Sequence, residues 1–372
     1  MNADPDIRLA TRGSDLAMRQ ATTIKSALDS RRRSVSLVEV ETTGDAIQDE
    51  LIHRLGKTGA FVRSLDEKVL SGELDAAVHS MKDMPTEMPD DLVVAATPER
   101  APSGDVLVTP DGKDIDQLSP EAVVGTSSLR RKAQLLAARP DLEIVPLRGN
   151  VDTRLEKLLA PTLQAEHEQL LDADDNAAAD PDEWFDSLST LEQSAMERRV
   201  ETEMDAIVLA EAGLQRGGLL DAVETARLPT PSFVPSPGQG AIAVTASDPD
   251  TVETIRDAVD HPRTRIETTV ERTVLAEVGG GCIAPIGVSA MLQGEYVQTR
   301  AQVLSHDGSE VIEATRDLPV ADHATAAADF AADLRERGAA ALITEARERA
   351  ESDDNSSVDA GGAETVMGGE DA

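Results

Sequence analysis

Basic side chains gather where the sequence predicts that strands end. Between Thr126 and Leu158 there are seven basic and four acidic residues, in a chain whose formal net charge is −35. Because arginine pairs with carboxylates through two parallel hydrogen bonds, this local positive charge favours an anionic ligand with several carboxylates. Any single arginine here could equally be a surface residue that pairs with a neighbouring acid. As a set at strand ends, they favour a binding site.

Two other residues are candidates for chemistry. Asp83 follows a predicted strand beside Lys82, so its carboxylate could stabilise a developing cation or transfer a proton. The sequence Asp-Met-Pro is also typical of a simple turn. Cys282 follows three glycines at 279–281, where its thiolate could be a nucleophile or an attachment point. A lone cysteine is, however, often an inert buried side chain.

The cysteine, histidine and apolar content of the sequence excludes several classes of site. Cys282 is the only cysteine, so neither an internal disulfide nor a cysteine-based zinc site is possible. The six histidines lack metal-ligand spacing, so we expect no metal. The acidic N-terminus has no apolar run behind it, and no apolar stretch reaches about 18 residues. We therefore expect a cytoplasmic protein.

The elements that must position these residues alternate between strand and helix. Short strands are predicted at 7–10, 36–41, 75–78, 92–97, 123–124 and 143–147. Helices are predicted at 15–28, 60–71, 129–138 and 325–347. Such alternation predicts parallel α/β layers, in which ligands bind at the carboxyl ends of strands and at helix N-termini.

The composition is strongly acidic, with 70 Asp plus Glu against 35 Lys plus Arg. Nucleic acid and anionic membranes would be repelled, so neither is expected as a partner. Many acids, few lysines and 2% aromatic residues suggest adaptation to high salt, which screens self-repulsion. The acidic segment 159–204 is predicted to be a partly disordered surface insertion, and 350–372 a disordered tail.

Seven stretches together resemble the porphobilinogen deaminase (hydroxymethylbilane synthase) family, and they occur in the family's order. They are residues 7–14, 43–45, 77–85, 124–131, 147–155, 237–241 and 271–287. The most specific are Ser-Met-Lys-Asp at 80–83 and Thr-Ser-Ser-Leu-Arg-Arg at 126–131. The resemblance covers most of residues 7–345, and the composition suggests a halophilic archaeon.

This resemblance implies a transferase of tetrapyrrole biosynthesis. Family members join four porphobilinogen units head to tail, each with loss of ammonia, and release a linear tetrapyrrole. The growing chain is carried on a dipyrromethane cofactor, which the enzyme builds itself and holds by a thioether that falls here on Cys282. Asp83 matches the catalytic carboxylate, which contacts pyrrole nitrogens and assists deamination and C–C bond formation. The family suggests a monomer.

The other matched residues divide between cofactor and substrate. Those assigned to the cofactor are Lys82, Ser128, Arg130 and Arg131. Those assigned to the substrate, or close to it, are Arg12, Ser14, Gln20, Thr126, Ser127, Arg148 and Arg154. In place of the family's Gly-Lys-Gly-Leu-Phe this chain has Gly-Lys-Thr-Gly-Ala-Phe, so either Lys57 or Arg63 takes the position of the family lysine.

The resemblance also implies three domains. Two are α/β domains of the periplasmic-binding-protein type, and the third is a small α+β domain that carries the cysteine. The first is expected at 1–100 and 239–258, the second at 105–234 with the insertion, and the third at 261–349. A non-catalytic binding protein with the same two-lobed fold is the rival interpretation, and it would need neither Cys282 nor Asp83.

Overall fold

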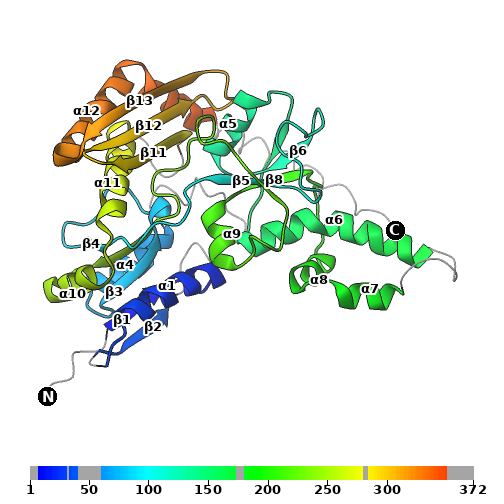
Figure 1. The fold of residues 1–372 in the computed structure, drawn as a ribbon, viewed down its shortest axis with the longest axis horizontal. Coiled ribbons are helices and arrows are strands. Elements are labelled where there is room, and N and C mark those ends of the chain that lie inside the picture. The colour runs from blue at the N-terminus through cyan, green and yellow to red at the C-terminus, as the bar shows by residue number, and fades with distance from the viewer. Residues whose placement is uncertain (1–6, 32, 41–59, 173–179, 280–283, 350–372) are drawn as a thin grey trace, which may run out of the picture.

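The structure is a computed structural model that describes residues 7–31, 33–40, 60–172, 180–279 and 284–349. Two five-stranded sheets and one three-stranded sheet organise these residues, with helices packed on their faces (Figure 1). Cys282, Lys57 and the acidic tail lie outside the described residues.

The first sheet has the strand order β2-β1-β3-β10-β4. Its strands are β1 (Ile7–Thr11), β2 (Val35–Glu39), β3 (Ala76–Ser80), β4 (Val93–Ala96) and β10 (Ile242–Ala246). Successive side chains of a strand point to opposite faces. Leu9 therefore packs with helices α1 (Asp15–Leu28) and α10 (Pro249–Val259), whereas Ala10 packs with α4 (Ala60–Leu70).

The second sheet repeats this plan with the order β7-β6-β8-β5-β9. Its strands are β5 (Asp105–Val108), β6 (Val123–Gly125), β7 (Glu143–Val145), β8 (Ala206–Ala210) and β9 (Thr225–Arg227). Helix α5 (Leu129–Ala138) packs on one face through Leu135. Helices α6 (Val151–Asp172) and α9 (Glu211–Gly217) cover the other through Leu155 and Leu214.

In each five-stranded sheet, one strand begins directly after the chain has crossed over from the other five-stranded sheet. β10 runs antiparallel between β3 and β4, and β5 runs antiparallel between β8 and β9. The expectation of purely parallel layers is therefore wrong for these two strands, because the chain crosses between the sheets at 97–104 and again at 228–241. We call each of the two five-stranded sheets, together with its helices, a lobe: the first lobe contains β1 and the second contains β6. The expected fold class, two α/β units plus a small α+β unit, is confirmed.

The third sheet is an antiparallel meander of β11 (Ile286–Gln293), β12 (Tyr296–Leu304) and β13 (Val311–Pro319). Helices α11 (Pro262–Glu277) and α12 (His323–Glu336) cover one face, with Val270 and Phe330 in the core between them and the strands. The predicted helix at 325–347 is interrupted at residues 337–338. Gly338 has a φ of +96°, which a helix does not accommodate.

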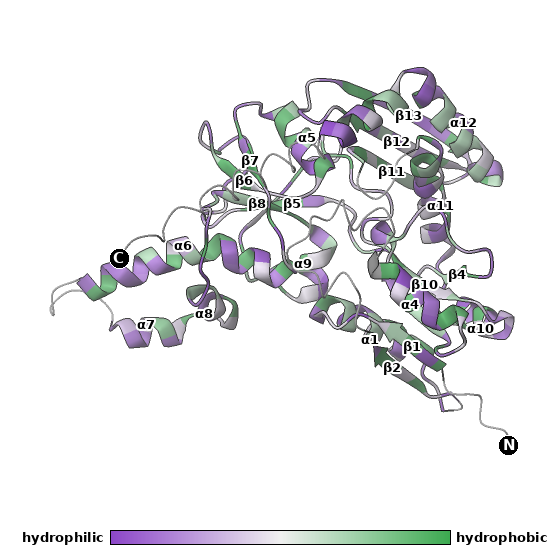
Figure 2. Cartoon of the chain, turned by 180° about the vertical axis from the view of Figure 1, so that it is seen from behind, coloured by the Kyte–Doolittle hydropathy of each residue, from purple (hydrophilic) through white to green (hydrophobic). Residues whose placement is uncertain are grey.

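The acidic insertion contains more helix than its charge predicts. Helix α6 continues to Asp172, and α7 (Pro181–Ser187) and α8 (Thr190–Met196) follow. Both views show these helices projecting away from the sheets (Figures 1 and 2). They pack on one another around Leu163 and Ala195, with Trp184 against them. This small apolar cluster explains the helices where we predicted partial disorder; residues 173–179 lie outside the described part.

Candidate active site

The candidate carboxylate Asp83 lies on a short 3₁₀ turn, η1 (Met81–Asp83), directly after β3. Met81 is buried and anchors the turn, because its N–H donates to the Ala241 carbonyl at 3.0 Å. Gly238 has a φ of +75°, and a Cβ there would lie 2.6 Å from Met81 Cγ. The turn therefore rests on the second crossover, with Asp83 exposed and Lys82 half-buried.

Three predicted residues follow β1 in the first lobe. Ser14 caps α1, and its hydroxyl accepts a hydrogen bond from the Ala17 N–H at 3.4 Å. Arg12 is half-buried just before the cap, and Gln20 is buried within the helix. The sequence therefore located this strand-to-helix turn correctly.

The equivalent turn of the second lobe connects β6 to α5. Ser128 caps α5 by accepting from the Arg131 N–H at 3.4 Å, and Thr126 is buried beneath it. The Ser127 hydroxyl donates to the Leu147 carbonyl at 2.9 Å and accepts from the Leu147 N–H at 3.0 Å. Ser127 thus joins this turn to the segment that follows β7.

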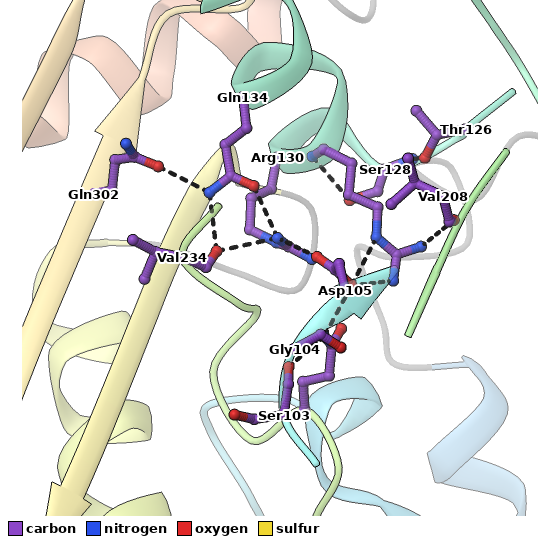
Figure 3. A network of polar contacts seen from close by, with 12 residues as sticks. Ser103, Gly104, Asp105, Thr126, Ser128, Arg130, Gln134, Val208, Val234 and Gln302 are labelled. Atoms are coloured by element: carbon purple, nitrogen blue, oxygen red, sulfur yellow. Dashed lines mark hydrogen bonds and ion pairs between the residues drawn. The ribbon is translucent and has the colours of Figure 1, made fainter. Parts of the chain in front are cut away.

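Arg130 and Arg131 point from α5 to one buried carboxylate, Asp105, the first residue of β5 (Figure 3). Arg130 Nη1 lies 2.8 Å from Asp105 Oδ2 and also donates to the Val234 carbonyl at 3.0 Å. Arg131 Nη2 donates to Asp105 Oδ1 at 2.8 Å, and Arg131 Nη1 donates to the Val208 carbonyl at 3.0 Å. Both guanidinium groups are therefore fixed by the protein itself.

Arg148 and Arg154 flank the start of α6. Arg154 Nε donates to the Gly149 carbonyl at 2.8 Å, and Arg148 is half-buried. Burial and, to a smaller extent, the nearby charge of Arg131 lower the pKa of Arg154 to about 10, although the charge of Asp83 opposes the shift. Arg154 of the second lobe therefore lies close enough to Asp83 of the first lobe for their charges to interact.

Lys82 belongs to the same electrostatic group. Its pKa is lowered, chiefly because the ammonium is desolvated, while Asp83 opposes this shift and Arg131 and Arg154 add to it. Three cations from three strand ends thus act on one another in a partly desolvated region. Bringing like charges together is unfavourable unless an anion compensates them. The arrangement is suited to bind a ligand with several carboxylates beside Asp83.

The remaining candidates are spread more widely. Arg63 is exposed on α4 and Lys57 lies outside the described residues, so the assignment of the family lysine's position to one of them stays a prediction. Within the described ranges, no group of three or more His, Cys, Asp or Glu is arranged to hold a metal ion. No described helix is both long and apolar enough to cross a membrane.

Sequence reasoning missed the buried residues that hold the site together. Asp105 was noted only as the start of a second unit, yet both α5 arginines pair with it. Gln239 donates to Asp105 Oδ1 at 2.9 Å from the second crossover. Glu271 of α11 is fully buried and pairs with Arg100 of the first crossover at 2.8 Å. A charged first residue on an otherwise apolar strand was the available signal for Asp105.

Comparison with known proteins decides the family. Residues 7–166 and 190–255 match the porphobilinogen deaminase dipyrromethane cofactor binding domain, and residues 265–336 match the porphobilinogen deaminase C-terminal domain. The chain belongs to the porphobilinogen deaminase family. The gap in the match at residues 167–189 covers the outer end of α6 and all of α7, which places that part of the insertion outside the shared family fold.

Relatives of this porphobilinogen deaminase family member cover nearly its whole length. A probable porphobilinogen deaminase of Halobacterium salinarum is 52% identical over 391 residues, covering 92% of this chain and 99% of the relative. The porphobilinogen deaminase of Sulfurimonas denitrificans is 38% identical over 342 residues, covering 91% and 96%. A halophilic archaeal relative agrees with the acidic composition.

The described residues fit the dipyrromethane group of porphobilinogen deaminases. That group carries carboxylate side chains, and the site offers Lys82, Arg131 and Arg154 with mutually unfavourable charges. Arg131 uses three of its five N–H groups on Asp105 and Val208 among the described residues, which leaves two that a carboxylate could accept from. The donor set is therefore suited to an anionic organic group.

Proposed function

We propose that this chain joins four porphobilinogen units head to tail into hydroxymethylbilane, releasing one ammonia for each unit. The observation that carries the proposal is a group of cations from both lobes: the charges of Lys82 and Arg154 interact with the exposed carboxylate of Asp83, and Arg131 acts on both cations. Porphobilinogen carries two carboxylates, so each added unit brings two negative charges. Cations fixed before the substrate arrives can neutralise these charges and align the incoming ring.

Asp83 is the proposed catalytic residue. Its carboxylate would accept hydrogen bonds from pyrrole N–H groups and stabilise the positive charge that develops as the bond to ammonia breaks. Lys82 and Arg154, from opposite lobes, place positive charge close to Asp83. A dipyrromethane group on Cys282, when bound, supplies the end to which the first unit is joined.

The other site residues are proposed to bind carboxylates of the cofactor or substrate. Lys82, Ser128, Arg130 and Arg131 are assigned to the cofactor. Arg12, Ser14, Gln20, Thr126, Ser127, Arg148 and Arg154 are assigned to the substrate. The positions of these residues after β1, β3, β6 and β7 support the assignment, because ligands of open α/β sheets bind at such strand ends.

We also propose the domain boundaries 1–100 with 239–258, 105–234 and 261–349, each built around one sheet. The cytoplasm is the proposed compartment, because the single cysteine excludes an internal disulfide and no apolar stretch reaches about 18 residues. The monomer is the proposed working state, because one chain supplies residues from both lobes to the site.

Intact mass and product analysis test this function together. Purified active protein should exceed its sequence mass by two pyrrole units and convert porphobilinogen into hydroxymethylbilane. Cys282→Ser should show the sequence mass alone and make no bilane while keeping the melting curve of the parent. Bilane synthesis by Cys282→Ser would refute the attachment site. Binding of porphobilinogen without turnover by the parent would favour the non-catalytic rival.

A further inference from the structure

Asp105 is the point where the second lobe meets both crossovers. It is 1% exposed, and its Oδ1 atom accepts hydrogen bonds from Arg131 Nη2 at 2.8 Å and from Arg131 Nε at 3.2 Å. Its Oδ2 atom lies 2.8 Å from Arg130 Nη1. One carboxylate therefore serves two consecutive guanidinium groups, as the close view shows (Figure 3).

The charge of Asp105 is needed to keep both arginines in place. Burial alone would raise the pKa of Asp105, but the charges of Arg130 and Arg131 hold it well below its usual range. The two guanidinium charges therefore favour the ionised form of this carboxyl group. Without it, two desolvated guanidinium groups on adjacent residues would repel each other.

The crossovers hold Asp105 itself. Gln239 is 1% exposed, and its Nε2 donates to Asp105 Oδ1 at 2.9 Å and to the Ser103 carbonyl at 2.6 Å. Gly240, next to it, has a φ of +82° and sits where a Cβ would lie 2.5 Å from the Ala101 carbonyl oxygen. The two crossovers are thus packed backbone to backbone at the position of Asp105.

The third sheet is connected to Asp105 through Arg130. Arg130 Nη1 donates to Gln134 Oε1 at 2.9 Å, and Gln134 Nε2 donates to Gln302 Oε1 at 2.8 Å on β12. Arg130 is 3% exposed, and its partners Asp105, Gln134 and Val234 are all buried protein groups. Arg131, in contrast, acts electrostatically on both Lys82 and Arg154. Of the two, Arg131 is the one whose orientation sets the charge at the site.

We propose that Asp105 is a positioning residue for the reaction, which fixes the Arg131 guanidinium so that it faces the carboxylates of the bound pyrrole chain. This inference rests on the proposed function. Asp105 touches neither substrate nor cofactor and acts only through Arg131. The alternative is that Asp105 merely compensates buried charge and stabilises the fold.

Two substitutions separate these roles. Asp105→Asn keeps the shape of the side chain and removes its charge, so it should lower the melting temperature. Asp105→Glu keeps the charge but moves the carboxylate by one methylene, so the protein should fold while Arg131 is displaced. Glu156→Gln is the matched control, since Glu156 is a buried carboxylate of the same lobe that pairs with Arg198.

The measurements are the melting curve, the fraction of protein that carries the dipyrromethane mass, and kcat and KM of the loaded fraction. For folded Asp105→Glu we expect a lower loaded fraction and a KM for porphobilinogen raised roughly tenfold, the equivalent of one charge-assisted hydrogen bond. Its kcat should change by less than its KM. Glu156→Gln should lower the melting temperature and leave the loaded fraction and KM unchanged.

Parental loading and KM in folded Asp105→Glu would overturn the positioning role and leave the proposed function standing. An equal change of loading and KM in Glu156→Gln would also overturn it, because a general loss of stability would then be the cause. A parent protein that carries no adduct and makes no bilane would overturn the proposed function, and the role of Asp105 with it.

Discussion

The two lobes place a strand-to-helix turn at the same position of the same sheet topology, yet the two turns differ in burial. β1 leads to Ser14 at the start of α1, and β6 leads to Ser128 at the start of α5. In the first lobe Arg12 precedes the cap and is half-buried. In the second, Arg130 lies inside the helix and is 3% exposed.

The cause of this difference is one residue on an equivalent strand. β5 and β10 are the antiparallel strands of their sheets, and Asp105 pairs with Ala210 where Ile242 pairs with Ser80. A buried carboxylate at the first position permits buried arginines, whereas an isoleucine does not. In the second lobe the protein itself therefore fixes the positively charged arginines in place. The first lobe instead presents Asp83, an exposed group that can act on a ligand.

The largest expected effect is the loss of kcat on substitution of Asp83, the proposed catalytic residue of the first lobe. Asp83→Asn should lower kcat by about 10²–10⁴-fold, because the charge that stabilises the developing cation is removed. The melting curve should stay unchanged, since Asp83 is exposed. Asp91→Asn, another exposed carboxylate of this lobe, is the control and should keep full activity. A kcat for Asp83→Asn within twofold of the parent would contradict the assignment.

Substitution of an arginine should cost more unfolding free energy in the second lobe than in the first. Arg131→Gln should raise KM and also cost about 3 kcal/mol of unfolding free energy, because it leaves buried Asp105 with one partner fewer. Arg12→Gln should raise KM and cost under about 1 kcal/mol, as for a partly exposed group. Urea unfolding and steady-state kinetics check both variants. Equal losses of unfolding free energy in the two variants would contradict the proposed difference between the lobes.

The two helix caps should behave alike, in contrast to the arginines. Ser14→Ala and Ser128→Ala each remove a hydroxyl that accepts an N–H at 3.4 Å, so each should cost about 1 kcal/mol. Thermal unfolding measures both losses. A loss more than twice as large for Ser128→Ala would show that this cap also supports the arginine pair.

The smallest effect concerns Asp260, which holds the start of the first crossover as Asp105 holds its end. Although burial opposes it, hydrogen bonds from Arg265 and from the Thr97 N–H lower the pKa of Asp260 below 3.8. The stability that it contributes is therefore complete above about pH 4 and is lost as the pH falls through the lowered pKa.

Asp260→Asn should accordingly cost up to about 1 kcal/mol at pH 7, and the difference from the parent should shrink as the pH falls below about 4 and through the lowered pKa. Urea unfolding of both proteins across this range measures it. A difference that grows toward low pH would reverse the sign of the argument. Arg265→Gln serves as the partner control, since it removes the other half of the same contact.

Local signals predicted the helices that carry the site. The helices predicted at 15–28 and 129–138 agree with the observed limits of α1 and α5. The helices of the insertion were not predicted, because its acidic residues outweighed the apolar side chains of Leu163 and Trp184, which pack only once α7 and α8 fold back on α6.

Non-local contacts could not be predicted in the same way. The Asp105–Gln239 hydrogen bond joins residues 134 positions apart, and β10 enters the first sheet far from its other strands. No periodicity in the sequence encodes either partner. The candidate residues at strand ends were therefore foreseeable, whereas the distant partners of the buried carboxylates were not.

The insertion of β10 between β3 and β4 has a consequence for synthesis on the ribosome. The first sheet cannot close until residues 242–246 have emerged, 146 positions after β4 ends at Ala96. At about 5–20 residues per second this delay lasts roughly 7–30 s. During it, β3 and β4 expose unpaired edges that could pair with other chains. The acidic surface of the nascent chain, through repulsion between neighbouring chains, is suited to protect it during this interval.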